Sequence, residues 1–275
     1  MGFWIGEVSK KLGYRFELWA KRIIVETSSA YNPRIVVAET ERFGKILILG
    51  EGEDTAFQYS DRWDFYEEML AHVPLCAHPS PKRVLIVGGG DGAVLREVLK
   101  HREVEKATLV EIDRRVIEVC REHFEHGRVF DDERAEVVIA DGAWYVGQRE
   151  SEFDVILGDY SDPYEGMPAA VLVSDQFYAD CRRALKDGGV VALQAGSPIF
   201  QPEITERVYR GLKAHFDDVL LYFSPMPIYP GGLWAYAIAS TGPDVRKPVR
   251  GVEGVRFYSR ELHGSLFDLF RPDFA

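Results

Sequence analysis

The sequence predicts an α/β fold in which a doubly wound, mostly parallel β-sheet follows a small antiparallel β-domain at the N-terminus. From residue 84 onward, short apolar runs alternate with amphipathic helical patterns, which is typical of a parallel sheet covered by helices. A glycine-rich turn at residues 88–92 joins the first of these runs to a helical pattern. Residues 14–50 carry short β-like runs separated by turn residues, which favours antiparallel strands.

The β-domain is predicted to occupy residues 1–60. Runs rich in valine and isoleucine cover Arg34–Ala38 and Lys45–Leu49, and Phe43 and Gly44 lie in the break between them. Branched apolar residues favour extended strands, and glycine favours the turn that connects two of them.

The second domain is predicted over residues 61–275. It begins with a helix at Trp63–Ala77, and the linker His78–Lys82, which contains two prolines, leads into the first buried strand. Strands are then predicted at 84–87, 106–110, 136–139, 154–158, 189–194, 218–222 and 234–239. Helices are predicted at 93–100, 114–124, 142–149, 174–185 and 201–215.

The composition argues against several classes of protein. The 275 residues carry a net charge of −11, from 33 basic and 44 acidic residues, so no nucleic-acid partner is expected. No apolar run is long enough to span a bilayer, and the first residues lack the pattern of a signal peptide. Three scattered cysteines are too few for a disulfide framework or a metal knuckle. We therefore expect a cytoplasmic protein without membrane association.

Polar residues collect where the predicted parallel strands end, which is the edge at which such sheets bind ligands. They are Asp91, Glu111, Asp141, Asp159, Asp162 and Gln194. Each acid alone has a structural explanation, because Asp commonly caps a following helix or starts a turn. Five acids at one edge repel each other unless a ligand offsets their charge, so we expect a cationic ligand there.

The glycine turn predicts a nucleoside site. Glycines allow a tight turn and close approach of a ligand, and Glu111, about 20 residues further on, can accept hydrogen bonds from both ribose hydroxyls. The spacing Gly88-x-Gly90-x-Gly92 differs from the dinucleotide pattern, which remains a distant alternative. It resembles the first motif of the Rossmann-like S-adenosylmethionine-dependent transferases. That resemblance implies a set of donor-binding residues: Gly88, Gly90, Asp91, Glu111, Ile112, Asp141 and Gly142. The more specific resemblance described below adds Gln58 as a donor-binding glutamine.

Asp91 indicates which donor is bound. It lies where the amino-acid end of S-adenosylmethionine is expected, and a buried Asp facing a carboxylate costs several kcal/mol without compensation. A decarboxylated donor has a purely cationic end, which favours Asp91. The alternative is that Asp91 binds only the ammonium of an intact donor.

Several longer motifs resemble the polyamine aminopropyltransferases, the spermidine and spermine synthase family. They are GGGDGAVLREVLKH, LVEID, FDVILGDYSDP, FYADCRRALKDGG and YPGGLW, and the likeness extends over nearly the whole chain. It implies transfer of an aminopropyl group from decarboxylated S-adenosylmethionine to a primary amine, with 5′-methylthioadenosine as the by-product. It also implies no metal, no permanently bound cofactor, small-molecule polyamine and nucleoside substrates, and a homodimer or homotetramer.

The resemblance also implies roles for the acceptor side. Asp159 matches the family's catalytic base within a D-x-x-D pattern, and Asp162 is expected to bind an amine. The other expected acceptor-binding residues are Tyr66, Glu67, Gln194, Tyr229 and Trp234. Aromatic side chains suit a methylene chain that carries ammonium groups.

The chain departs from the family pattern mainly on this acceptor side. Glu67 replaces a histidine, Gly196 replaces a glutamate and Tyr160 replaces a serine, while the register of the segment 51–68 around Gln58 is irregular. Loss of the acid at 196 predicts an acceptor longer than putrescine, such as spermidine or another long polyamine, or a broad range of acceptors. The alternative is that an acid within 51–68 substitutes and putrescine is preferred. Two other functions stay open at this point, a methyltransferase that uses the intact donor and a non-catalytic polyamine or nucleoside sensor.

Overall fold

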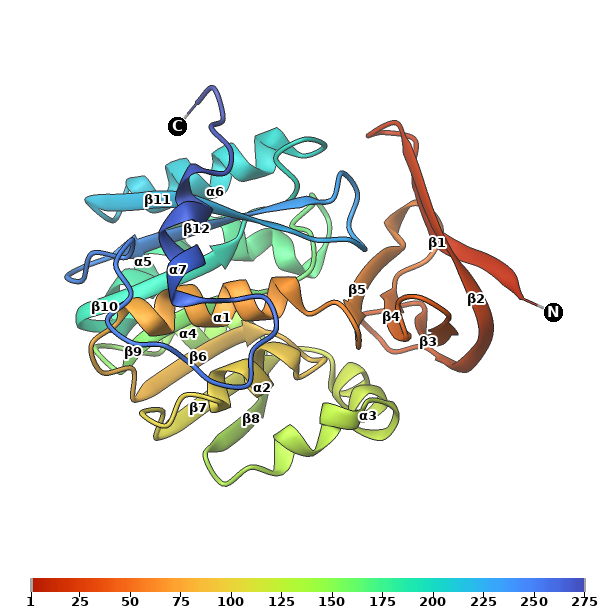
Figure 1. The fold of residues 1–275 in the computed structure, drawn as a ribbon, viewed down its shortest axis with the longest axis horizontal. Coiled ribbons are helices and arrows are strands. Elements are labelled where there is room, and N and C mark those ends of the chain that lie inside the picture. The colour runs from red at the N-terminus through yellow and green to blue at the C-terminus, as the bar shows by residue number, and fades with distance from the viewer. Residues whose placement is uncertain (1, 275) are drawn as a thin grey trace.

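The computed structural model describes residues 2–274 and contains two β-sheets (Figure 1). The smaller, N-terminal sheet is antiparallel, and its five strands pair in chain order. They are β1 (Phe3–Ser9), β2 (Tyr14–Thr27), β3 (Ile35–Thr40), β4 (Lys45–Leu49) and β5 (Ala56–Ser60). The strands β3 and β4 match the two predicted runs, whereas the charged segment before β5 hides that strand from a reading of the sequence.

The larger sheet has seven strands in the order β11-β12-β10-β9-β6-β7-β8. They are β6 (Arg83–Gly88), β7 (Lys106–Glu111), β8 (Ala135–Ile139), β9 (Phe153–Asp159), β10 (Leu185–Gln194), β11 (Asp218–Pro225) and β12 (Leu233–Ser240). The pairs among β6 to β10 are parallel, and β12 runs antiparallel to both of its neighbours. The predicted doubly wound, mostly parallel sheet is therefore confirmed.

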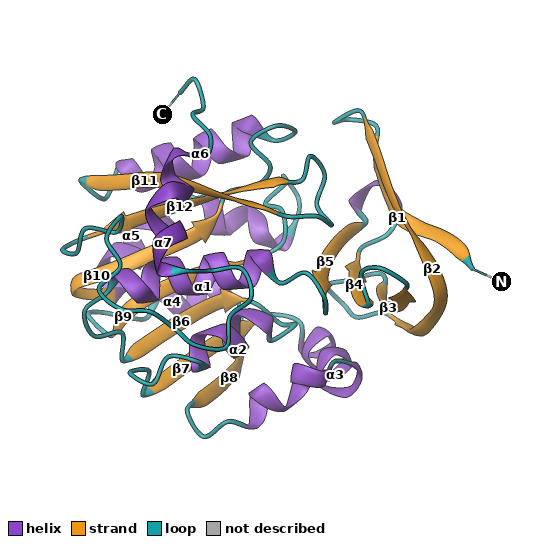
Figure 2. Cartoon of the chain, in the orientation of Figure 1, coloured by secondary structure: helices purple, strands orange, loops and turns teal. Residues whose placement is uncertain are grey.

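Helices cover both faces of this sheet (Figure 2). They are α1 (Phe65–Ala77), α2 (Ala93–Leu99), α3 (Arg114–His123), α4 (Gly142–Gly147), α5 (Asp175–Ala184), α6 (Pro202–Lys213) and the short α7 (Arg260–His263). Apolar residues of α1 and α2 share one buried cluster with the sheet, and those of α4, α5 and α6 share another on the opposite face. The strands are thus buried on both sides, which explains their continuous apolar runs.

The observed ends differ from the predicted ones by a few residues, and local caps explain some of the differences. Ser174 accepts a hydrogen bond from the Phe177 amide, so α5 starts one residue after it. Asp113 accepts a hydrogen bond from the Arg115 amide and caps α3, which begins at Arg114. None of the helices within residues 2–274 is long and apolar enough to cross a membrane.

A third apolar cluster joins the two sheets. Ile35, Val37 and Leu47 of the N-terminal sheet pack with Val116 and Cys120 of α3. The break between the sheets in the chain lies between β5 and α1, close to the predicted boundary at residue 60. This packing fixes the N-terminal sheet over the carboxyl ends of the parallel strands, where the cavity lies.

Candidate active site

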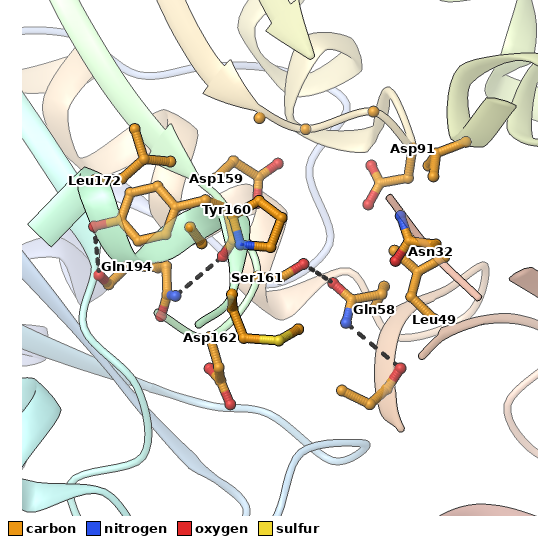
Figure 3. A pocket seen from close by; sticks show the side chains of 18 of the residues that line it. Asn32, Leu49, Gln58, Asp91, Asp159, Tyr160, Ser161, Asp162, Leu172 and Gln194 are labelled. Atoms are coloured by element: carbon orange, nitrogen blue, oxygen red, sulfur yellow. Dashed lines mark hydrogen bonds between the residues drawn. The ribbon is translucent and has the colours of Figure 1, made fainter. Parts of the chain in front are cut away.

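A cavity lies between the carboxyl ends of the parallel strands and the N-terminal sheet (Figure 3). The cavity and its open mouth together enclose about 1450 Å³ of free space. Every site residue predicted from the sequence lines this cavity except Glu67. The topology therefore brings together residues that lie more than 170 positions apart in the chain, from Gln58 to Trp234.

The glycine turn after β6 depends on having no side chains. Gly88 has a φ of +86°, and a Cβ there would lie 2.1 Å from the carbonyl oxygen of Asp159. A Cβ at Gly90 would lie 2.8 Å from Cγ of Glu111. These contacts exclude larger residues, so the turn lies directly against the ends of β7 and β9.

Glu111 and Asp141 follow neighbouring strands and face the same side of the cavity. Glu111 accepts hydrogen bonds from the amides of Gly90 at 3.1 Å and Asp113 at 2.8 Å. Burial raises the pKa of Glu111 to about 7, although these amides oppose the rise. Asp141 caps α4 by accepting from the Trp144 amide at 2.8 Å, so it serves both as a cap and as cavity wall.

Asp91 lies in the glycine turn with its carboxylate at the cavity wall. Its Oδ1 accepts a hydrogen bond from the Ala93 amide at 2.7 Å, and its backbone carbonyl lies 2.8 Å from Nε2 of His126. Burial raises the pKa of Asp91 to about 6, although the hydrogen bond from the Ala93 amide and the charge of Arg96 oppose the rise. Both contacts fix the direction in which the carboxylate points.

Asp159 ends β9 beside the glycine turn, and its carbonyl accepts from the Gly89 amide at 2.7 Å. Its Oδ2 is enclosed and finds no hydrogen-bond partner among the described residues. Burial raises the pKa of this carboxyl well above its usual range, the charge of Asp91 raises it further, and Tyr66 offsets only part of the rise. A buried, unpartnered carboxyl in a cavity is a candidate for proton transfer.

Asp162 lies further along the loop after β9. Its Oδ2 accepts from Nε2 of Gln201 at 2.6 Å, and burial raises its pKa to about 6 while Gln201 and Tyr164 oppose the rise. Within residues 2–274, no group of three or more His, Cys, Asp or Glu side chains is placed to hold a metal ion.

Aromatic rings line the cavity beside these acids. The ring centroids of Tyr229 and Trp234 are 4.6 Å apart, and those of Tyr66 and Tyr229 are 5.8 Å apart. The hydroxyl of Tyr229 donates to the backbone carbonyl of Gln58 at 2.8 Å, and Oγ of Ser161 lies 3.4 Å from Oε1 of Gln58. Gln58 therefore links the N-terminal sheet to two loops of the larger domain.

The comparisons with known proteins agree with this geometry. The family model described as the spermine/spermidine synthase domain matches residues 63–247. A polyamine aminopropyltransferase of Caldicellulosiruptor bescii is 39% identical over 250 residues, which cover 89% of this chain and 88% of that protein. Polyamine aminopropyltransferase 1 of Bacillus cereus is 41% identical over 242 residues, 86% of each chain.

The chain belongs to the spermine and spermidine synthase family.

Solved structures of this family superpose on the whole fold. A crystal structure of a spermidine synthase in complex with the transition-state analogue AdoDATO has a TM-score of 0.87 and 37% identity, over 97% of this chain and 92% of that chain. The spermidine synthase from Thermotoga maritima has a TM-score of 0.85 and 35% identity, over 96% and 90%. The predicted enzyme class, an aminopropyltransferase of this family, is confirmed.

The departures from the spermine and spermidine synthase pattern have structural consequences. Gly196 has a φ of +74°, and a Cβ there would lie 2.9 Å from Oε1 of Gln201, so the glycine leaves space that Gln201 fills. The ring of Tyr160 is buried, and its hydroxyl lies 3.4 Å from the carbonyl of Gln194. The Gln194 amide donates to the Tyr160 carbonyl and accepts from the Gly196 amide, which ties the two strand ends together.

One cavity acid was missed by the sequence reading. Glu7 of β1 lines the cavity, is 4% exposed, and its Oε1 has no hydrogen-bond partner in the part of the chain described. Burial raises the pKa of Glu7 to about 8, and the charge of Asp162 contributes to the rise. Alternation in β1 supplies the missing signal, because Ile5 and Glu7 are both buried while their neighbours are more exposed.

Burial of these acids predicts that the empty protein loses stability above about pH 6.5. The unfolded chain releases carboxyl protons near pH 4, so the free energy of unfolding falls as the pH rises toward the native pKa values of about 7 for Glu111 and 8 for Glu7. Burial lowers the pKa values of His101 and His126 to about 3 and 4. These histidines have the opposite effect on the free energy of unfolding, but only below about pH 6.5.

The melting temperature measured from pH 6.5 to 8.5 is therefore expected to fall by several °C, at about 2–4 °C per kcal/mol for a chain of this size. Glu7→Gln is expected to make the fall shallower, with the exposed Glu53→Gln as the matched control. A melting temperature that stays constant or rises over this range would contradict the proposed protonation of the cavity acids.

Proposed function

We propose that the cavity catalyses aminopropyl transfer from decarboxylated S-adenosylmethionine to a polyamine and releases 5′-methylthioadenosine. The observation that carries the proposal is the enclosed Oδ2 of Asp159, which has no hydrogen-bond partner among residues 2–274, in a cavity that is also lined by a nucleoside-type glycine turn and by aromatic rings. The family membership supports the same reaction.

The donor is proposed to occupy the half of the cavity formed by β6, β7 and the turn after β8. Glu111 accepts hydrogen bonds from the ribose hydroxyls, and Asp141 lies near the adenine. The absence of side chains at Gly88 and Gly90 lets the turn pack against Asp159 and Glu111, and the nucleoside is proposed to lie along the backbone of this turn. Asp91 binds the ammonium of the aminopropyl end, and this favours a decarboxylated donor over the intact one that a methyltransferase uses.

The reaction needs a neutral amine aimed at carbon. The amine lone pair attacks the methylene carbon next to the sulfonium, the new N–C bond forms, and the C–S bond breaks with its electron pair on sulfur. Asp159 takes the proton that the amine loses. The positive charges of the donor and acceptor lower the pKa of Asp159, so the carboxyl becomes a base when both substrates are bound.

The acceptor is proposed to lie along the aromatic wall between Asp159 and the N-terminal sheet. Tyr229 and Trp234 suit its methylene chain and add cation–π attraction to an ammonium, worth about 0.5–2 kcal/mol. Asp162 and Glu7 form an acidic pair at the far end, where the charge of Asp162 adds to the burial that raises the pKa of Glu7. An ammonium bound there removes the cost of burying two acids together.

We further propose that the preferred acceptor is longer than putrescine. The glycine at 196 removes an acid from the strand end, and the free acid of this region is Glu7 on β1, in a different sheet. The sequence left open that an acid within residues 51–68 replaces the acid missing at position 196. Glu7 lies outside that segment. A longer amine brings its second ammonium to the N-terminal sheet.

The proposal is tested by initial rates with decarboxylated donor and putrescine, cadaverine, agmatine or spermidine. We expect methylthioadenosine to form in equal amount with the aminopropylated amine, and spermidine to have the highest kcat/KM. A clear preference for putrescine would overturn the longer acceptor only. Absence of turnover with every amine, despite binding, would favour a sensor, and methylation of an amine by the intact donor would favour a methyltransferase.

Glu7→Gln is expected to raise KM for the acceptor about tenfold, because a charge-assisted hydrogen bond contributes about 1.5–3 kcal/mol. The kcat value and the affinity for methylthioadenosine are expected to change little, since Asp159 and the donor half are untouched. Glu53→Gln, at an exposed acid of the turn between β4 and β5, is the matched control. Equal KM values in wild type and Glu7→Gln would remove Glu7 from the acceptor site.

The oligomeric state and the location are also proposals. The N-terminal sheet exposes a group of large apolar side chains: Phe3, Trp4, Trp19 and Ile23. This face suits contact with a second copy in a homodimer or homotetramer, and light scattering in solution tests it. A cytoplasmic location is supported by the free, buried state of Cys76, Cys120 and Cys181 and is tested by cell fractionation.

A further inference from the structure

Glu67 is a buried acid whose role the proposed mechanism does not use. Glu67 is the third residue of α1. Only 1% of the residue is exposed, and it does not line the cavity. Neither Oε1 nor Oε2 has a hydrogen-bond partner among residues 2–274. An ionised carboxylate enclosed in this way is strongly disfavoured, so Glu67 needs either a proton or a cation.

The neighbouring acid Glu68 shows what a satisfied carboxylate looks like at this place in the fold. It accepts three backbone hydrogen bonds, from the amides of Arg256, Phe257 and Tyr258, at 2.7 to 2.8 Å. Glu67 has no such contacts, although it is the adjacent residue on the same helix. Glu68 holds the C-terminal segment and Glu67 does not. Anchoring of that segment by this turn of α1 therefore does not explain the acid at position 67.

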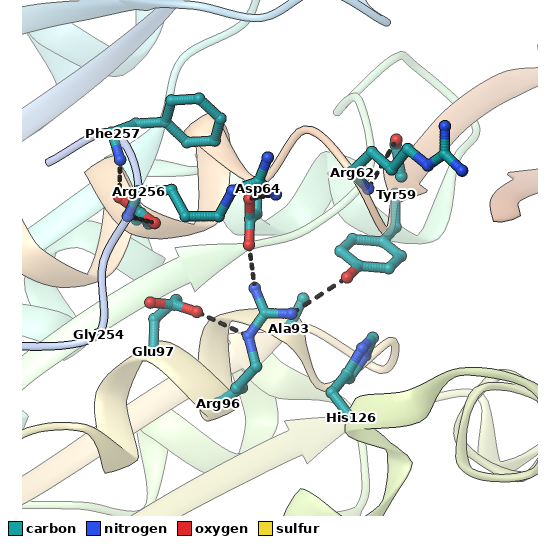
Figure 4. Close-up of polar contacts among 12 residues, drawn as sticks. Tyr59, Arg62, Asp64, Ala93, Arg96, Glu97, His126, Gly254, Arg256 and Phe257 are labelled. Carbon is teal, nitrogen blue, oxygen red and sulfur yellow. Dashed lines mark hydrogen bonds and ion pairs between the residues drawn. The ribbon is translucent and has the colours of Figure 1, made fainter. Parts of the chain in front are cut away.

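The cation whose charge lowers the pKa of Glu67 is Arg96 of α2, and its guanidinium is already engaged (Figure 4). Its Nε donates to Glu97 at 2.6 Å, and its Nη2 donates to Asp64 at 3.0 Å. Its remaining contact is from Nη1 to the hydroxyl of Tyr59 at 3.1 Å. The guanidinium therefore lowers the pKa of Glu67 through space but makes no hydrogen bond to it.

The charged and titratable groups that act on Glu67, or that its charge acts on, come from several elements. They are Asp91 of the glycine turn, Arg96 of α2, Asp64 before α1, Tyr59 of β5, Tyr229 of the loop before β12, and Tyr236 of β12. Burial raises the pKa of Glu67 well above its usual range, and the largest charge effect comes from Asp91. The proton affinity of Glu67 therefore depends on the charge of the site through Asp91.

We propose that Glu67 is a proton-releasing acid behind the donor site, which is protonated in the empty enzyme and ionises when the cationic aminopropyl end of the donor binds beside Asp91. The carboxyl then becomes a carboxylate and its proton goes to solvent. Glu67 acts through the charge of Asp91 and does not contact the reacting atoms. The inference rests on the proposed donor site at Asp91.

The physical reason is the change in charge around Asp91. In the empty site, Asp91 faces Glu67 and Asp159 with no bound cation, and a second negative charge beside it is unfavourable. The donor brings a sulfonium and an ammonium, which offset Asp91 and remove the repulsion. Methylthioadenosine has the same nucleoside but neither positive charge, so its binding leaves the proton on Glu67.

Calorimetry tests this with decarboxylated donor at pH 8, in two buffers of different ionisation enthalpy. The measurement is made in Asp159→Asn protein, because Asp159 also holds a raised pKa and its proton must not contribute. Asp91, with a pKa of about 6, is already ionised at this pH. We expect release of up to about one proton per donor bound, and affinity that rises by up to about tenfold per pH unit.

Adding Glu67→Gln to the Asp159→Asn protein is expected to abolish most of this release and to flatten the pH dependence. Methylthioadenosine is expected to bind both proteins equally without proton release, which shows that the amide preserves the fold and the nucleoside site. Glu118→Gln, at an exposed acid of α3, is the matched control variant.

The outcomes separate the inference from the proposed donor site. Equal proton release with and without Glu67 would overturn the inference, and so would release of the same size with methylthioadenosine. If Asp91→Asn also leaves donor affinity unchanged, the donor site itself is misplaced. If Asp91→Asn weakens the donor while Glu67→Gln changes neither release nor pH dependence, only the role of Glu67 is wrong.

Discussion

Asp159→Asn is expected to lower kcat by about 10²–10⁴-fold, the range for loss of a positioned general base. The amide keeps the size of the side chain and leaves the Gly89 contact intact, because that contact uses the backbone carbonyl of Asp159. It cannot take the proton of the attacking amine. The loss should therefore appear in the chemical step, measured by single-turnover formation of methylthioadenosine.

Donor and acceptor affinities measured by calorimetry provide the control for this variant. Donor binding is expected to change by less than the loss in rate, because Asp91 and Glu111 remain in place. Asp217→Asn, at an exposed acid, should match wild type in every measurement. Near-normal kcat in Asp159→Asn would remove the proton-transfer role from this residue.

Asp91→Asn is expected to weaken decarboxylated donor about 10- to 100-fold, since a hydrogen bond between charged groups contributes about 1.5–3 kcal/mol. The Ala93 amide still has an oxygen to bind, because Asn retains the acceptor that caps this turn. The affinity for methylthioadenosine, which lacks the ammonium, should stay close to that of wild type.

The same variant tests the choice of donor. An asparagine no longer repels the carboxylate of intact S-adenosylmethionine, so the preference for the decarboxylated form should shrink. Affinities for both donors, measured side by side in wild type and Asp91→Asn, check this. A wild-type protein that binds the intact donor more tightly would contradict the assignment of Asp91.

The larger sheet was predictable because its signals are local. Apolar runs such as that of β6 and the helical spacing of α1 follow from burial on both faces of a sheet, and each sits within a short window of sequence. The ends were less accurate, since they depend on caps and on strand pairing, as at Ser174. The strands β1 and β2 were not delimited, because charged and turn residues interrupt their alternation, and β5 was hidden by the charged segment before it.

The donor half and the acceptor half of the site also differ in how well the sequence predicted them. The donor half follows β6 and β7 directly in the chain, so Glu111 was found from its spacing to the glycine turn and Asp91 from its place within the turn, with the donor roles implied by the family resemblance. The acceptor half is assembled from β1, the loop after β9 and the loop before β12. Its members share no spacing, which is why Glu7 was missed and the segment around Gln58 stayed irregular.

The sequence by itself determined the fold class, the glycine turn and the acids that end successive parallel strands, because each of these is set by neighbours in the chain. Only the tertiary structure decided which acids are left without partners. Glu68 and Glu67 are adjacent, yet packing of the C-terminal segment gives three amide donors to one and none to the other. Burial and pairing depend on what a fold brings from a distance, and those contacts set the proton affinity of Glu7, Glu67 and Asp159.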